Sequence, residues 1–350
     1  MSTRSGAAAT AASAASSLDN STDTRSLSEL AVDVVVPVFN AETTLAETLE
    51  SILGQSHRAL TLFVVDDGST DGSRAIASRF AEADPRVRLV QQQNAGVAAA
   101  RNNGAAQGSA PYIAFCDADD LWRPDKLTRQ LQRLDQGGEA MGLVYCGFAQ
   151  IDDADRIVFV RWGLEEGRIF ARLMRANFMG NGSCPMFRRA AFEALGGFNA
   201  GHTPAEDLGI YLESARRFEV GVVADPLVGY RQRPDGLSSN GAAVYLATER
   251  ILFDLLPFEP ALRRDVRSHL AGVLAWQVVR AARQRQFGDA GRLLAMRPAL
   301  LTRTLGPLGA RVLGKVFSGA AAEFGRRVLN MPTQETFAIA RRNADPASGD

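Results

Sequence analysis

Apolar runs alternate with helical patterns along residues 33–116, and this alternation limits the possible folds of the chain more than any other feature. Short runs rich in Val, Ile, Leu and Phe predict buried strands at residues 33–39, 60–65, 87–91 and 110–116. Helical patterns lie between them, at residues 41–53, 73–83 and 94–107. Strands and helices at this spacing are typical of βαβ units, so the predicted fold class is α/β with a parallel sheet covered on both faces.

The second half of the chain is less regular. Strands are predicted at residues 142–151, 156–162, 183–187 and 220–230. Helices are predicted at residues 189–195, from Glu206 to Arg217, and at 242–255, 261–284 and 289–296. The carboxyl-terminal third is therefore expected to be helical.

Composition excludes several function classes. The net charge of the 350 residues is zero, so nothing global indicates nucleic-acid binding. Three widely spaced cysteines form neither a zinc pattern nor a disulfide framework, which favours a reducing cytoplasm. No apolar stretch reaches the roughly 18 residues that a membrane-spanning helix needs. The first 30 residues, rich in Ala, Ser and Thr, predict a disordered tail rather than a signal peptide.

Polar side chains follow three of the predicted strands. Asn40, Asp66, Asp67 and the acidic run Asp117–Asp120 all stand at strand ends, where open α/β sheets bind their ligands. Three carboxylates within four residues repel one another unless a cation lies among them, and their oxygen ligands suit Mg²⁺ or Mn²⁺. The alternative is an acidic turn that caps the following helix, with Pro124 in its first turn. Neither G-x-G-x-x-G after the first strand nor a P-loop is present.

Six ordered motifs together resemble the family 2 glycosyltransferases. They are VVVPVFN (34–40), VVDDGSTDGS (64–73), NAGVAAARNNG (94–104), FCDADDLWRPDKL (115–127), MFRRAAFEALGGFN (186–199) and AEDLGIYL (205–212). The resemblance covers roughly residues 32–240 and implies an inverting enzyme with a glycosyltransferase A-type (Rossmann-like) fold, a mostly parallel sheet flanked by helices. It implies a catalytic domain at 31–240, with a nucleotide-binding half (31–120) and an acceptor half (121–240). A helical carboxyl-terminal extension (241–342) and a disordered tail (343–350) would follow.

The resemblance implies a nucleotide-binding loop at the end of the first strand. The loop residues are Pro37, Val38, Phe39 and Asn40, with Glu42 also expected to contact the nucleotide. Phe39 would stack on the base, unless it packs in the core. Asp67 would accept a hydrogen bond from a ring N–H of the base, which favours UDP without settling the base, whereas Asp66 would hold the turn.

The same resemblance assigns the chemistry to carboxylates. Asp117 would face the ribose or metal, and Asp119 would ligate a Mg²⁺ or Mn²⁺ ion on the diphosphate leaving group. Asp120 would help or only cap the following helix, and Arg101 would orient a carboxylate or the sugar. Asp207 would be the general base, unless it only complements the amino-terminal end of its helix.

Four further residues have weaker expected roles at the acceptor or diphosphate. They are Glu206, His202, Arg231 and Arg233. Arg233 stands where many family members carry His. Between residues 290 and 322 there are basic and apolar residues but no acidic ones, so this segment is predicted either to lie on an anionic membrane surface or to pack on the protein.

The expected activity is sugar transfer from a nucleotide-sugar donor, UDP-sugar favoured, to a hydroxyl of a glycan or lipid-linked acceptor. It would belong to bacterial polysaccharide or glycoconjugate synthesis, in the cytoplasm or on the inner face of the membrane. The alternatives are a sugar nucleotidyltransferase, which normally needs a Gly-rich phosphate loop, and a non-catalytic nucleotide-sugar-binding protein with the same fold.

Overall fold

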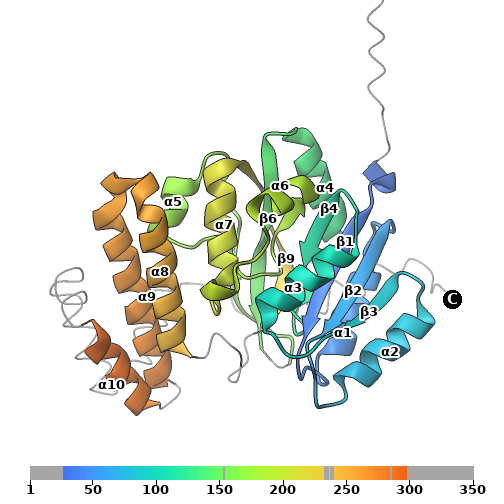
Figure 1. Ribbon diagram of the computed structural model, residues 1–350, viewed down its shortest axis with the longest axis horizontal. Helices are drawn as coiled ribbons and strands as arrows, with labels where there is room; N and C mark the ends of the chain where they lie inside the picture. Colours follow the sequence, from blue (N-terminus) through green and yellow to red (C-terminus); the bar gives the residue numbers. More distant parts are fainter. Residues whose placement is uncertain (1–26, 153, 232–235, 237–239, 284–285, 298–350) are drawn as a thin grey trace, which may run out of the picture.

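The computed structural model of the protein describes residues 27–152, 154–231, 236, 240–283 and 286–297 (Figure 1). The described strands are β1 (Val32–Val38), β2 (Leu60–Asp66), β3 (Val87–Gln91), β4 (Tyr112–Phe115), β5 (Leu121–Trp122), β6 (Met141–Ile151), β7 (Ile157–Arg161), β8 (Met186–Arg188) and β9 (Glu219–Arg231). They form one sheet in the order β3-β2-β1-β4-β8-β6-β9-β5, and β7 pairs with β6.

The amino-terminal half of this sheet is parallel, as the alternation of strands and helices predicts. β1 pairs in parallel with β2 and β4, and β2 pairs in parallel with β3. All seven residues of β1 are buried, because helices cover both faces. Gly104 lets one of these helices approach closely: a Cβ on it would lie 2.4 Å from Val35 Cγ1 and 2.8 Å from Val65 Cγ2.

The helices around the sheet follow the predicted pattern closely. They are α1 (Leu45–Leu53), α2 (Ser73–Ala83), α3 (Val97–Gln107), α4 (Lys126–Gln136), α5 (Phe170–Arg175), α6 (Arg189–Leu195) and α7 (Glu206–Arg217). The predicted bounds of α2 and α6 are confirmed, whereas α1 and α3 begin a few residues later than expected. The short helix α5 had no sequence prediction.

The sheet departs from the parallel pattern in its second half. β8 is antiparallel to both neighbours, β4 and β6, and β5 is antiparallel to β9. β6 and β9 return to parallel pairing over most of their length. The predicted fold class, a mostly parallel α/β sheet with flanking helices, is confirmed in this mixed form.

Three helices extend the molecule beyond the sheet, as predicted. They are α8 (Gly241–Leu255), α9 (Arg263–Arg283) and α10 (Phe287–Met296). Figure 1 shows them as a separate layer on the side of α5 and α7, and one apolar cluster runs continuously from the sheet into this layer.

The predicted basic segment 290–322 falls mostly outside the described residues, which end at 297. Within it, Ala290 and Leu293 are buried, and Arg297 forms an ion pair with Glu249 at 2.9 Å. This part packs on the protein, and membrane contact by the remainder stays a prediction. No described helix combines the length and apolarity needed to cross a bilayer.

Candidate active site

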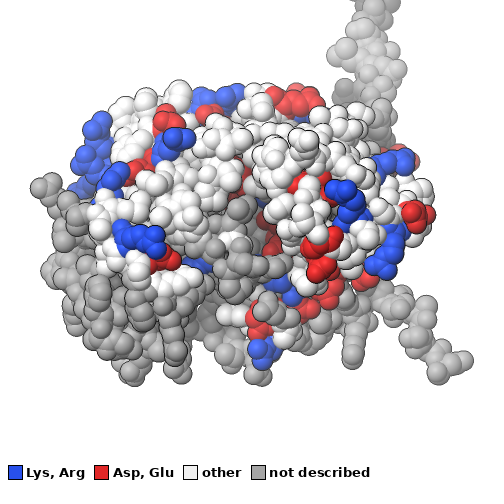
Figure 2. All heavy atoms as spheres, turned by 60° about the horizontal axis from the view of Figure 1, so that its bottom comes forward, with Lys and Arg blue, Asp and Glu red and all other residues white. Residues whose placement is uncertain are grey.

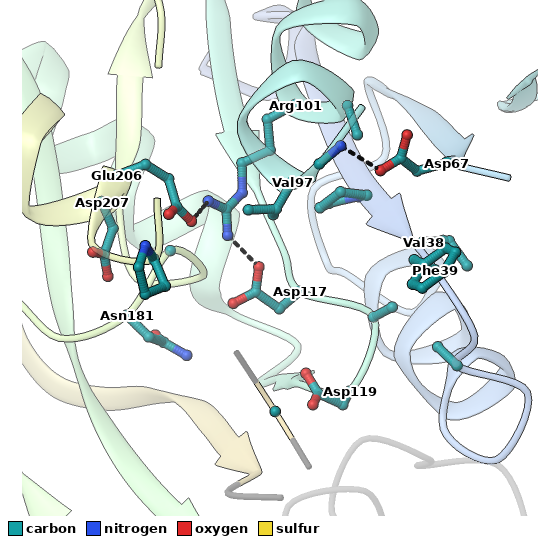
Figure 3. Close-up of a pocket in the computed structure, with 18 of the residues that line it drawn as sticks. Val38, Phe39, Asp67, Val97, Arg101, Asp117, Asp119, Asn181, Glu206 and Asp207 are labelled. Atoms are coloured by element: carbon teal, nitrogen blue, oxygen red, sulfur yellow. Dashed lines mark hydrogen bonds and ion pairs between the residues drawn. The ribbon is translucent and has the colours of Figure 1, made fainter. Parts of the chain in front are cut away.

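One cleft of about 650 Å³ opens at the carboxyl ends of the parallel strands. Figure 3 shows labelled side chains converging on it from β1, β2, α3, the β4 end and the start of α7, and Figure 2 shows acidic side chains within the hollow of this face. Of the residues selected from the sequence, eleven line the cleft: Pro37, Val38, Phe39, Asn40, Asp67, Arg101, Asp117, Asp119, Glu206, Asp207 and Arg231.

The loop after β1 is tied to the turn after β2. Asn40 adopts a left-handed conformation with φ of 51°, and its Oδ1 accepts a hydrogen bond from the Thr70 amide at 2.8 Å. Glu42 Oε2 accepts from the Gly72 amide at 2.7 Å, so its carboxylate lies against the turn and does not line the cleft. Phe39 is 51% exposed, so the alternative that it packs in the core is wrong.

Asp66 and Asp67 have different surroundings. Asp66 is fully buried and holds the turn, as expected, by accepting from the Ser69 amide at 2.9 Å and from Arg74 Nε at 2.6 Å. Asp67 lines the cleft and accepts three hydrogen bonds from the β3–α3 loop: from Gln92 Nε2 at 2.7 Å, and from the amides of Ala95 at 2.8 Å and Gly96 at 2.9 Å. Asp67 therefore holds the β3–α3 loop against the end of β2, in the same cleft that Phe39 lines.

Arg101 joins the two halves of the cleft. Its Nη2 donates to Asp117 Oδ1 at 2.5 Å and its Nη1 donates to Glu206 Oε1 at 2.8 Å, with only 3% of the side chain exposed. Although burial opposes the charged form, Asp117 and Glu206 raise the pKa of Arg101 above its ordinary value. Among the described residues, Glu206 Oε2 is buried without a hydrogen-bond partner. This oxygen can accept a hydrogen bond from a hydroxyl of a ligand.

The acidic run is held in a fixed shape by its last member. Asp120 is fully buried, and its carboxylate accepts from Asn181 Nδ2 and Ser183 Oγ, both at 2.5 Å, and from the Arg231 amide at 3.0 Å. The alternative that Asp120 caps the following helix is wrong, because α4 begins at Lys126 with Asp125 in the capping position. Asp120 instead braces the loop that presents Asp117 and Asp119.

The acidic run offers two carboxylates to the cleft, those of Asp117 and Asp119. No group of three or more metal-ligating side chains occurs in the described part of the chain. One Asp117 oxygen is engaged by Arg101, whereas Asp119 presents a partly exposed carboxylate to the cleft. Mg²⁺ and Mn²⁺ are often bound by one or two carboxylates plus substrate phosphates, and these residues fit that mode.

The carboxyl group of Asp207 has a raised pKa. Burial and the negative charge of Glu206 raise its pKa to about 7, although Arg101 and a hydrogen bond from the Leu208 amide at 2.7 Å oppose the shift. It lies at the first turn of α7 and faces the cleft from the wall opposite Phe39 (Figure 3). A carboxyl group with this pKa can exchange protons near neutral pH.

The remaining expected residues are placed differently. His202 does not line the cleft; its ring contacts Asn199 through Nε2 at 3.2 Å. Arg233 lies outside the described residues. Among the lining residues that the sequence did not indicate are Asn181 and Gly182. A Cβ on Gly182 would lie 2.5 Å from Arg101 Nη2, and only the Asn-Gly turn signal could have indicated this approach.

Comparison with known proteins gives one consistent result. The model of the family described as Glycosyl transferase family 2 matches residues 33–196. The chain is 40% identical over 102 residues to the putative teichuronic acid biosynthesis glycosyltransferase TuaG of Bacillus subtilis (strain 168), over 29% of this chain. The match covers only 40% of that protein's length.

Two solved structures have a similar fold. Residues 1–349 of S. aureus TarS, in complex with UDP-GlcNAc, superpose with a TM-score of 0.55 at 17% identity, covering 83% of this chain and 89% of that one. The mannosyltransferase PcManGT from Pyrobaculum calidifontis, in complex with GDP-Man and Mn²⁺, gives 0.54 at 21% identity, covering 86% and 88%. At these identities the likeness concerns the fold alone.

Proposed function

The chain belongs to glycosyl transferase family 2, and from this membership we propose that it transfers a sugar from a nucleotide-sugar donor to a hydroxyl acceptor with inversion at the anomeric carbon. The observation that carries the proposal is the set of residues that line this cleft. It combines an exposed aromatic ring at Phe39, the carboxylates Asp117 and Asp119, and the base Asp207 with its raised pKa.

The donor nucleotide would occupy the side of the cleft at β1 and β2. The exposed ring of Phe39 would stack on the base, and Asp67 would face the edge of the base. Asp67 would accept a hydrogen bond from a ring N–H of the base. Uracil has such a donor at N3, which favours UDP. The TarS structure is a complex with UDP-GlcNAc and the PcManGT structure is a complex with GDP-Man, so the fold itself accommodates both bases.

The diphosphate would lie beside the acidic run. Asp119, with Asp117 next to it, would hold a divalent cation that neutralises charge on the leaving diphosphate. Arg101 keeps Asp117 in place through the 2.5 Å ion pair and is itself almost fully buried. The loop therefore presents its carboxylates without the reorganisation that mobile side chains would require.

Asp207 would act on the acceptor. Its carboxylate would take the proton of the acceptor hydroxyl while that oxygen forms a bond to the anomeric carbon and the bond to the diphosphate oxygen breaks on the opposite face. The unpartnered Oε2 of Glu206 would accept a hydrogen bond from a hydroxyl of the donor sugar or acceptor. A glycan or lipid-linked acceptor in bacterial polysaccharide or glycoconjugate synthesis, met at the cytoplasmic face of the membrane, completes the proposal.

A nucleotide-release screen tests this function. Purified protein is incubated with UDP-, GDP- and dTDP-sugars and Mn²⁺, and release of the nucleotide diphosphate is followed with and without glycan acceptors. We expect slow hydrolysis of one donor without acceptor and faster release with the matching acceptor, whose product carries the inverted configuration by NMR. Tight donor binding without turnover across the whole acceptor panel would instead identify a non-catalytic binding protein.

A further inference from the structure

Arg231, the last residue of β9, lines the cleft and contacts the acidic run. Its backbone amide donates to Asp120 Oδ1 at 3.0 Å, and its Nε donates to the backbone carbonyl of Asp119 at 3.1 Å. Only 5% of its side chain is exposed. One residue therefore holds both the side chain of Asp120 and the peptide group of Asp119.

Two carboxylates from other elements fix the guanidinium group of Arg231. Its Nη2 lies 3.1 Å from Glu47 Oε2 on α1 and 2.8 Å from Asp155 Oδ1 in the turn between β6 and β7. The guanidinium group is planar, so anchoring Nη2 also orients Nε, which contacts Asp119. We call Arg231, Glu47 and Asp155 the Arg231 clamp.

We propose that the Arg231 clamp positions Asp119 for the divalent cation of the proposed reaction. The inference rests on the proposed function, and it makes Arg231 a positioning residue instead of a direct ligand of acceptor or diphosphate. The peptide group that the clamp holds belongs to the same residue as the proposed ligand carboxylate, so a rotation of that peptide would move the carboxylate. Loss of a partner that orients a ligand typically lowers metal affinity by roughly 10- to 100-fold.

Glu47→Gln tests the clamp without changing Arg231 or the cleft. The measurement is the melting temperature of the full chain with saturating UDP while Mn²⁺ is titrated, with UDP plus EDTA as the reference. We expect Glu47→Gln to raise the half-maximal Mn²⁺ concentration roughly 10-fold. The shift with UDP in EDTA stays at the wild-type value, because the base pocket is untouched.

Glu50→Gln is the matched control, because Glu50 is an exposed glutamate on the same helix α1. It removes the same charge and is expected to leave the Mn²⁺ titration at its wild-type midpoint. Arg231→Lys is the second test, because it keeps the positive charge but loses the planar guanidinium group with its several N–H donors. It should shift the Mn²⁺ midpoint at least as far as Glu47→Gln. If Arg231→Lys lowers the melting temperature of the unliganded protein, its Mn²⁺ midpoint is set aside. The Mn²⁺ midpoint of Glu47→Gln then tests the clamp by itself.

The outcomes separate this inference from the proposed function. Equal Mn²⁺ midpoints for wild type, Glu47→Gln and Glu50→Gln would overturn the clamp while leaving the function intact. A wild-type protein that UDP stabilises with no effect of Mn²⁺ would overturn the proposed metal role, and the clamp with it. A wild-type protein that UDP does not stabilise, with or without Mn²⁺, would contradict both UDP as donor nucleotide and the clamp.

Discussion

Arg101 and Glu206, 105 positions apart in the sequence, form a buried ion pair with 2.8 Å between Nη1 and Oε1. The same guanidinium group binds Asp117, so the end of the strand that presents the acidic run is connected to the helix that presents Asp207. This connection keeps the proposed base and the proposed leaving-group site at a fixed separation.

Removal of Arg101 should destabilise the fold. Arg101→Met removes the guanidinium group that pairs with Asp117 and Glu206. Breaking a buried ion pair in this way lowers the free energy of unfolding by about 3–5 kcal/mol. Urea unfolding followed by circular dichroism measures the change. Arg175→Met is the control: Arg175 pairs with Asp265 at the surface, and loss of such a pair changes the free energy of unfolding by about 1 kcal/mol or less. Equal effects of the two substitutions would contradict the structural role of Arg101.

Activity should depend on pH through Asp207. A base must be ionised, so kcat/KM is expected to rise with an apparent pKa of about 7 and to level off above it. Arg101 lowers the pKa of Asp207, so Arg101→Met should move the midpoint to higher pH, whereas Arg101→Lys, which keeps the charge, should move it less. A pH–rate profile of nucleotide release measures this, and an unchanged midpoint in Arg101→Met would contradict the assignment.

The free energy of unfolding should fall as the pH rises, whereas activity should increase. The pKa of Asp207 is about 7 in the folded protein against an ordinary value of 3.8, so the folded state binds more protons between these values. The contribution of Asp207 to the free energy of unfolding is therefore fully present below about pH 4 and is lost as the pH rises through 7. Asp207→Asn should remove this loss. Parallel stability profiles of wild type and Asp207→Asn from pH 4 to 8 would contradict the raised pKa.

Phe39 should contribute to nucleotide affinity but not to stability. Phe39 is 51% exposed and lines the cleft, and loss of base stacking costs roughly 1–3 kcal/mol of binding free energy. Calorimetric titration with UDP measures the loss in Phe39→Ala. Phe253→Ala is the control, because Phe253 is 43% exposed on α8, away from the cleft. UDP affinity that is equal in wild type and both variants would exclude stacking on Phe39.

Asp119 should couple UDP binding to the metal. In Asp119→Ala the Mn²⁺-dependent part of the UDP-induced rise in melting temperature is expected to disappear, while the rise seen in EDTA remains. Asp125→Ala, which removes an aspartate that precedes α4 and does not line the cleft, serves as the comparison. A full Mn²⁺ response in Asp119→Ala would mean that other residues hold the cation.

Local patterns predicted the parallel half of the sheet, because β-branched runs and amphipathic helices reflect burial in nearby layers. The convergence of Asn40, Asp67 and Asp117 on one cleft also followed, since parallel strands end at one edge. The antiparallel placement of β8 between β4 and β6 could not be predicted, because strand order depends on contacts far apart in sequence.

The hydrogen-bond and ion-pair partners of the site residues could not be predicted from the sequence either. The acidic residue Asp120 resembled a helix cap in the sequence, but its partners Asn181, Ser183 and Arg231 come from distant segments. Arg101 was expected near the donor, but its link to Glu206 joins residues 105 positions apart in the sequence. The roles of the cleft residues remain predictions.

The most direct test of the account is nucleotide release by Asp207→Asn with the donor and acceptor that wild type turns over. The account predicts a fall in acceptor-dependent release of roughly 100- to 10,000-fold, the usual contribution of a general base, with UDP-sugar affinity by calorimetry unchanged. Acceptor-dependent release at the wild-type rate in a variant that still binds the donor would contradict the central claim that Asp207 is the base of a glycosyl transfer.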